Sequence, residues 1–190
     1  MPFDAREREA ALTSPALERL RTIHRALDAV SERTGKAVAW LSLAMVLVIG
    51  WDVAMRYLFN RGSVALQEME WHLFALLFLL SAAYTLKHND HVRVDILYNT
   101  KMSPRGRAWV DLFGTLFFLV PFSLLIIKSS WPFVCNAYLA GEGSPDPGGL
   151  PYRFVLKAAI PAGFALVLVQ GISEIAKLLH FLLRREPEAN

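Results

Sequence analysis

The fold is decided by residues 108–131, AWVDLFGTLFFLVPFSLLIIKSSW, where apolar side chains run almost without interruption. A helix rises about 1.5 Å per residue, so roughly 20 such residues cross the hydrocarbon layer of a bilayer, which is about 30 Å thick. Three further apolar stretches of similar length lie at residues 37–58, 66–86 and 154–176. The sequence therefore predicts an all-α integral membrane protein with four transmembrane helices.

The composition leaves room for one membrane domain in the 190 residues, because 54% of them are hydrophobic and 19% are charged. We place this four-helix domain at residues 37–183, between an N-terminal segment, residues 1–36, and a tail, residues 184–190. The net charge of +3 comes mainly from basic residues at span ends, which anchor helices to membrane lipid and do not indicate nucleic-acid binding. Cys135 is the only cysteine, which excludes an intrachain disulfide.

The N-terminal segment has the pattern of an amphipathic helix. Its apolar residues recur at three- and four-residue steps: Leu17, Leu20, Ile23, Leu27 and Val30. Ser14 and Pro15 form a suitable helix start. We expect this helix to lie on the membrane surface before the first span, and a solvated or partner-docked arm is the alternative.

Basic residues are distributed unevenly among the segments that connect the spans. They gather in the middle connection and at both ends of the chain: Lys87, Arg93, Lys101, Arg105, Arg107, Arg33, Lys36, Arg184 and Arg185. The third connection is instead acidic at Glu142 and Asp146. Because cytoplasmic loops carry the excess of Lys and Arg, the N- and C-termini are predicted to be cytoplasmic, with two hairpins facing outward.

Charged residues near the outer ends of the first two spans are the candidates for a functional site. Asp52 and Arg56 are four residues apart on one helix face, as in a helix ion pair, which could contact a partner helix or satisfy itself. Glu68 and Glu70 open the second span, where carboxylates also suit the helix dipole. With Arg56, Arg61 and Lys128 they could form one outer charge cluster.

The middle of every predicted span lacks a charged side chain, although a transport pathway normally places polar groups there. This pattern favours an accessory membrane subunit over a complete transporter. The sequence also lacks a Ser-His-Asp set, a metal-spaced cluster and a phosphate-binding glycine loop, so we predict no enzyme, metal or cofactor. His72 and His180 lie about 20 Å apart in depth and cannot share a haem, but a membrane-anchor or electron-transfer subunit remains the alternative class.

Glycine and proline punctuate the third connection, which reads GEGSPDPGGLP at residues 141–151. Such a run cannot continue either neighbouring helix, so it predicts a shaped, ordered turn. Pro121 and Pro161 lie inside the third and fourth spans, where proline usually bends a helix.

Several short motifs follow one another around the four spans. They are RYLFN at residues 56–60, LQEMEW at 66–71, HVRVD at 91–95, EGS at 142–144 and GLP at 149–151. In this order and spacing the chain resembles the small permease subunit of tripartite ATP-independent periplasmic (TRAP) transporters, over about residues 40–180. It departs from the family in Ser81-Ala82-Ala83, where a glycine is frequent, and in Met69, which separates acids that are commonly adjacent.

The resemblance implies a sodium-coupled importer of organic acids or related solutes in the bacterial inner membrane. In such systems a periplasmic solute-binding protein delivers the solute to a large permease subunit, and the small subunit is thought to brace the scaffold of the large one. On this basis we expect the following residues to contact the partner subunit: Asp52, Arg56, Asn60, Glu68, Glu70, His91 and Asp95. At the periplasmic face we expect contacts from Glu142, Ser144 and Pro151.

Overall fold

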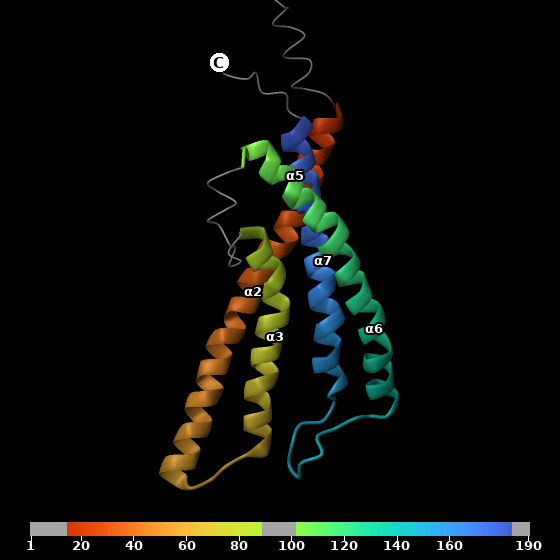
Figure 1. Cartoon of the computed structure of the whole chain (residues 1–190). Helices are drawn as coiled ribbons and strands as arrows, with labels where there is room; N and C mark the ends of the chain where they lie inside the picture. The colour runs from red at the N-terminus through yellow and green to blue at the C-terminus, as the bar shows by residue number, and fades with distance from the viewer. Residues whose placement is uncertain (1–14, 89–101, 184–190) are drawn as a thin grey trace, which may run out of the picture.

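The computed structural model describes residues 15–88 and 102–183, and its long elements in these ranges are all helices (Figure 1). They are α2 (Pro15–Phe59), α3 (Val64–His88), α5 (Pro104–Gly114), the π-helical segment η1 (Thr115–Leu119), α6 (Val120–Leu139) and α7 (Phe154–Leu183). α5, η1 and α6 follow one another directly and form one span. The four predicted spans are confirmed, since α2, α3, α5–η1–α6 and α7 are each long and apolar enough to cross a membrane.

The helix α7 is the centre of the arrangement. It packs against α2, α3, α5, η1 and α6, whereas α6 packs mainly on α7 and its own continuation η1. The start of α2 and the end of α7 lie together at one end of the molecule, which we call the termini end (Figure 1). The connections at residues 60–63 and 140–153 lie at the opposite end, the loop end. The cytoplasmic location of the termini end remains a prediction from the charge distribution.

Small residues allow α7 to approach its neighbours closely. A Cβ atom added to Gly163 would lie 2.6 Å from the backbone oxygen of Leu79 in α3. A Cβ atom on Gly171 would lie 2.6 Å from Cδ2 of Leu119 in η1. Helices in lipid associate by such close van der Waals packing, because lipid tails are as apolar as the side chains themselves.

The third span is longer than its sequence predicted, because α6 continues past residue 131 to Leu139. Its path also contains the π-helical segment, which ends as the backbone N–H of Val120 donates to the oxygen of Thr115. Pro121 follows at once. Its ring would clash with the preceding turn of a regular α-helix and its nitrogen cannot donate, so a wider turn accommodates it. The fourth span continues as a helix through Pro161.

The N-terminal segment also differs from the prediction. Residues 15–36 are helical, but they continue into the first span as one 45-residue helix, so there is no separate surface helix before the membrane domain. At about 1.5 Å per residue this helix is roughly 68 Å long, about twice the hydrocarbon thickness. The apolar stripe stays exposed at Ile23 and Val30, while Ser31 and Val38 are buried.

Contacts with α3 and α7 explain why the helix α2 stays continuous. Asp28 accepts hydrogen bonds from Ser173 at 2.6 Å and from Gln170 at 3.1 Å, and its carboxylate lies 3.0 Å from the ammonium group of Lys177. Glu32 pairs with Lys87 at 2.7 Å. Gly35 packs against Tyr84, whose Cβ atom would lie 2.8 Å from an added Cβ. Residues 15–36 are therefore docked on the ends of two spans.

We expect Asp28→Ala to loosen this docking, because three donors on α7 lose the carboxylate that joins them to α2. Gln170 and Lys177 keep Glu174, which lies on α7 itself, and Ser173 keeps only the backbone oxygen of His24 on α2. Losing such part-buried hydrogen bonds typically reduces the free energy of unfolding by about 2 kcal/mol. Backbone amides of residues 18–36 should then exchange hydrogen faster in detergent solution, with little change in α3. Glu18→Ala is a matched control, because Glu18 is an exposed acid on the same helix. Equal exchange in the two variants would contradict the prediction.

Candidate functional site

The loop end is organised around the carboxylate of Glu68, near the start of α3. Glu68 is only 4% exposed. The hydroxyl of Ser144 donates to its Oε1 at 2.6 Å, and the backbone N–H of Leu150 donates to its Oε2 at 2.6 Å. The guanidinium of Arg153 lies 3.2 Å from Oε1. One carboxylate thus ties α3 to the connection between α6 and α7 by three charge-assisted hydrogen bonds.

The connection itself is an ordered turn, as its glycine- and proline-rich sequence predicted. The backbone N–H of Ser144 donates to the oxygen of Leu150 at 3.0 Å, and that of Arg153 donates to the oxygen of Glu142 at 2.9 Å. A Cβ atom on Gly149 would collide with Ser144 and would lie 2.8 Å from Oε2 of Glu68. Only glycine therefore fits where the turn passes over the carboxylate.

Two cations at the loop end also lie over aromatic rings. Arg153 lies over the indole ring of Trp71, with its guanidinium carbon 5.6 Å from the ring centroid. Lys157 pairs with Glu142 at 2.5 Å and lies 3.9 Å from the ring centroid of Phe133 in α6. Cations over aromatic faces are attracted by the ring quadrupole. α3, α6 and α7 are therefore joined at this end by polar contacts.

Asp52 and Arg56 form the ion pair that their spacing predicted. Asp52 is fully buried, whereas the side chain of Arg56 is 47% exposed. The second carboxylate oxygen of Asp52, Oδ1, has no hydrogen-bond partner within the described part of the chain. Only one of the two carboxylate oxygens of Asp52 therefore has a partner among the described residues.

The other predicted contact residues have varied surroundings. Asn60 follows the end of α2 with φ at 50°, a left-handed conformation that asparagine tolerates well, and it is exposed. Glu70 is half-buried, without a hydrogen bond or ion pair to the described residues, and Pro151 is exposed. His91 and Asp95 lie outside the described residues.

The expected outer charge cluster does not form as one unit. Glu68 pairs with Arg153, and Arg56 pairs with Asp52. Lys128 is exposed and lies 11 residues before Leu139, the end of α6 (139 − 128 = 11). Because α6 runs eight residues further than the predicted span (139 − 131 = 8), Lys128 does not lie at its end, and the absence of charge from the middle of every span stays a prediction.

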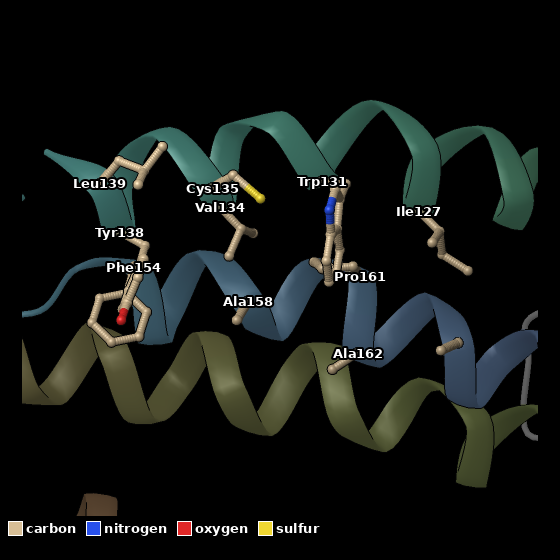
Figure 2. A pocket seen from close by; sticks show the side chains of 11 residues that line it. Ile127, Trp131, Val134, Cys135, Tyr138, Leu139, Phe154, Ala158, Pro161 and Ala162 are labelled. Carbon is tan, nitrogen blue, oxygen red and sulfur yellow. The ribbon is translucent and has the colours of Figure 1, made fainter.

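An apolar groove runs between α6 and α7 near the loop end (Figure 2). Its volume is about 670 Å³, and its lining includes Ile127, Trp131, Cys135, Phe154 and Pro161. Its walls offer no charged group. Across residues 15–88 and 102–183, no three His, Cys, Asp or Glu side chains are grouped so that they could hold a metal ion. The groove is therefore suited to apolar contact.

Comparison with known proteins identifies the family. The family described as tripartite ATP-independent periplasmic transporters, DctQ component, matches residues 45–181, which include the last part of α2, all of α3 and of the α5–η1–α6 span, and α7 up to residue 181. The chain belongs to the DctQ family. The matched range contains the Glu68 cluster and the turn that covers it, whereas residues 15–44 of α2 precede it.

Relatives of this DctQ-type subunit carry consistent names. The chain is 32% identical over 150 residues to a protein of Haemophilus influenzae named as a TRAP transporter small permease, covering 78% of this chain and 88% of the relative. It is 28% identical over 150 residues to the C4-dicarboxylate TRAP transporter small permease DctQ of Vibrio cholerae, covering 68% of this chain and 64% of the relative. The chain is therefore a small permease subunit of a TRAP transporter and a multi-pass protein of the bacterial inner membrane.

Sequence reasoning missed several residues that hold this DctQ subunit together. Asp28 and Glu32 were treated as part of an amphipathic segment, and Gln170 and Ser173 lie in a stretch counted only as apolar. Gln170 and Ser173 are 0% exposed and point at Asp28. Their polarity within the fourth span was the available signal, since buried polar groups in a membrane helix require a partner.

Proposed function

We propose that this DctQ subunit braces the scaffold of the large permease subunit in a sodium-coupled importer of organic acids or related solutes. Its partners on this proposal are the large TRAP permease subunit, the periplasmic solute-binding protein and membrane lipid. The observation that carries the proposal is the openness of the four spans. In the most apolar 18-residue stretch of α3 only 6% of the residues are buried, and in that of α7 28% are buried.

This openness supports an accessory role because the spans do not close around an interior. α6 reaches the rest of the molecule chiefly through α7, so the two hairpins spread into an open layer (Figure 1). Large apolar side chains are exposed along the first three spans, including Trp40, Val46, Leu47, Phe78 and Phe118. A layer of this kind offers broad lateral surfaces to a larger membrane protein, and the only groove described above is apolar.

We propose that the loop end faces the periplasm and helps to dock the solute-binding protein. Pro151 is exposed there beside Tyr152, which is 66% exposed. Glu142 and Ser144 are instead used within the turn, so their proposed role is to hold its shape. Asp52, Arg56, Asn60 and Glu70 remain proposed contacts to the large subunit at this end, with Glu68 ordering them. His91 and Asp95 are proposed contacts at the cytoplasmic side.

Co-purification tests the proposal directly. The chain, tagged at its C-terminus and co-expressed with the large subunit, should recover a much larger polytopic protein in equal amount from mild detergent. Reconstituted together, the two subunits should take up solute only with a sodium gradient and the binding protein, and the small subunit alone should not transport. Recovery of the chain alone, carrying a haem absorption band, would instead favour the electron-transfer alternative.

A further inference from the structure

The outward face of α6 carries a cation, Lys128, which has no ion pair or hydrogen bond with the described residues and lies 11 residues before the end of the helix. Buried residues of α6 recur every seven positions at Ser123, Ser130 and Ala137, and they define the face that packs on α7. At about 100° per residue, Lys128 lies on the opposite side of the helix from this stripe. Its neighbours there are the exposed Leu124 and Leu125.

The position of Lys128 along the span follows from contacts between α6 and the antiparallel α7. Phe133 lies level with Lys157, which is paired with Glu142 at the loop end. Trp131 and Pro161 line the groove together (Figure 2). Lys128 lies five residues further from the loop end than Phe133, which corresponds to about 7.5 Å along the helix. It is therefore level with the apolar middle of α7, beyond Pro161.

A lysine in a membrane helix usually extends its side chain toward the polar surface of the bilayer, and the direction of α6 opposes this for Lys128. Side chains on a helix lean toward its N-terminus, and α6 runs from the termini end toward the loop end. The Cα–Cβ bond of Lys128 is therefore tilted away from the loop end, which is the nearer end of the span. Lys157 shows the contrast, because α7 runs the other way and its ammonium group reaches Glu142. Lys128 forms no ion pair or hydrogen bond within residues 15–88 and 102–183.

We propose that Lys128 binds a carboxylate on a transmembrane helix of the large permease subunit, seated along α6 beside the apolar groove. This inference rests on the proposed function and names its contact. Intramembrane charges almost always face protein or a polar partner, and here the chain itself supplies none that is described. The groove borders the lysine through Ile127 and Trp131 and would hold the apolar side of the same helix. A lipid phosphate is disfavoured because the Cα–Cβ bond of Lys128 is tilted away from the nearer end of the span.

The test is recovery of the large subunit with tagged variants of the full chain. Lys128→Glu should reduce recovery at least about tenfold, because a like charge facing a carboxylate costs several kcal/mol. Lys128→Met should reduce it about threefold, and Lys128→Arg should retain it. Ser129→Met, on a neighbouring exposed position, is the control. For the isolated subunit, Lys128→Met should not lower the unfolding temperature, since no contact within the described chain is lost.

Each outcome decides the matter. Restoration of the Lys128→Glu complex by an Asp or Glu to Lys change in a membrane helix of the large subunit would identify the partner. Full recovery with both Lys128→Glu and Lys128→Met would overturn the inference while leaving the proposed function intact. If the Lys128→Met variant loses a phospholipid that the wild type binds but still recovers the large subunit normally, Lys128 binds lipid and the inference is overturned. Absence of the large subunit from the wild-type preparation would overturn the proposed function itself.

Discussion

Replacing Gly163 by leucine should separate α3 from α7 and unfold the membrane domain at a markedly lower temperature. The added Cβ alone would lie 2.6 Å from the backbone oxygen and 3.1 Å from the backbone carbon of Leu79, and backbone atoms cannot rotate away. Forcing extra carbon atoms into a close-packed contact typically costs 1–3 kcal/mol, and we expect about 3 kcal/mol here because the whole helix must shift.

The measurement is thermal unfolding of the purified chain in detergent, together with size-exclusion chromatography. Gly50→Leu is the matched control, because a Cβ atom at Gly50 in α2 meets nothing within 4 Å. Gly163→Leu should also shift the chain toward aggregated fractions, whereas Gly50→Leu should elute as the wild type does. Equal unfolding temperatures for the two variants would mean that α3 and α7 are not in close contact.

Glu68→Gln should release the turn at the loop end. The amide group keeps one acceptor oxygen but places donors against the N–H of Leu150 or the hydroxyl of Ser144, and it removes the negative charge that holds Arg153. Cleavage by trypsin after Arg153 follows the population of the opened turn, and we expect it to become about tenfold faster.

Glu70→Gln provides the comparison, because Glu70 lies two residues further along α3 without a hydrogen bond or ion pair to the described residues. Its rate of cleavage after Arg153 should equal that of the wild type. A Glu68→Gln protein as resistant as Glu70→Gln would show that the carboxylate does not hold the turn.

The spans could be predicted because each depends on a local property, a long apolar run, but their ends could not be placed as well. The third span was predicted at residues 108–131, yet α6 continues to Leu139 along the start of α7, where Tyr138 contacts Phe154. Likewise, the first span was predicted to begin at residue 37, yet the helix begins at Pro15, and Asp28, Glu32 and Gly35 contact other spans along its first part.

Some residues of the contact network around Glu68 were singled out from the sequence, but their contacts with one another were not predicted. The motif at residues 142–144 and the acid Glu68 were both singled out, but their hydrogen bond joins positions 76 residues apart. Such a pairing depends on which spans are neighbours, and four apolar helices carry little information about their order in space. The pair Asp52 and Arg56 was predictable because both residues lie on one helix.

The central place of α7 has a consequence for how the protein is made. It is synthesised after the other three described spans, yet it is the span that joins α2 and α3 to the α5–η1–α6 span. Until α7 enters the bilayer, α2 and α3 can pack against each other, but the third span lacks the described helix against which it packs. Packing of the third span therefore waits until α7 has been synthesised. Until then the third span is exposed to lipid and to the quality-control proteases of the membrane.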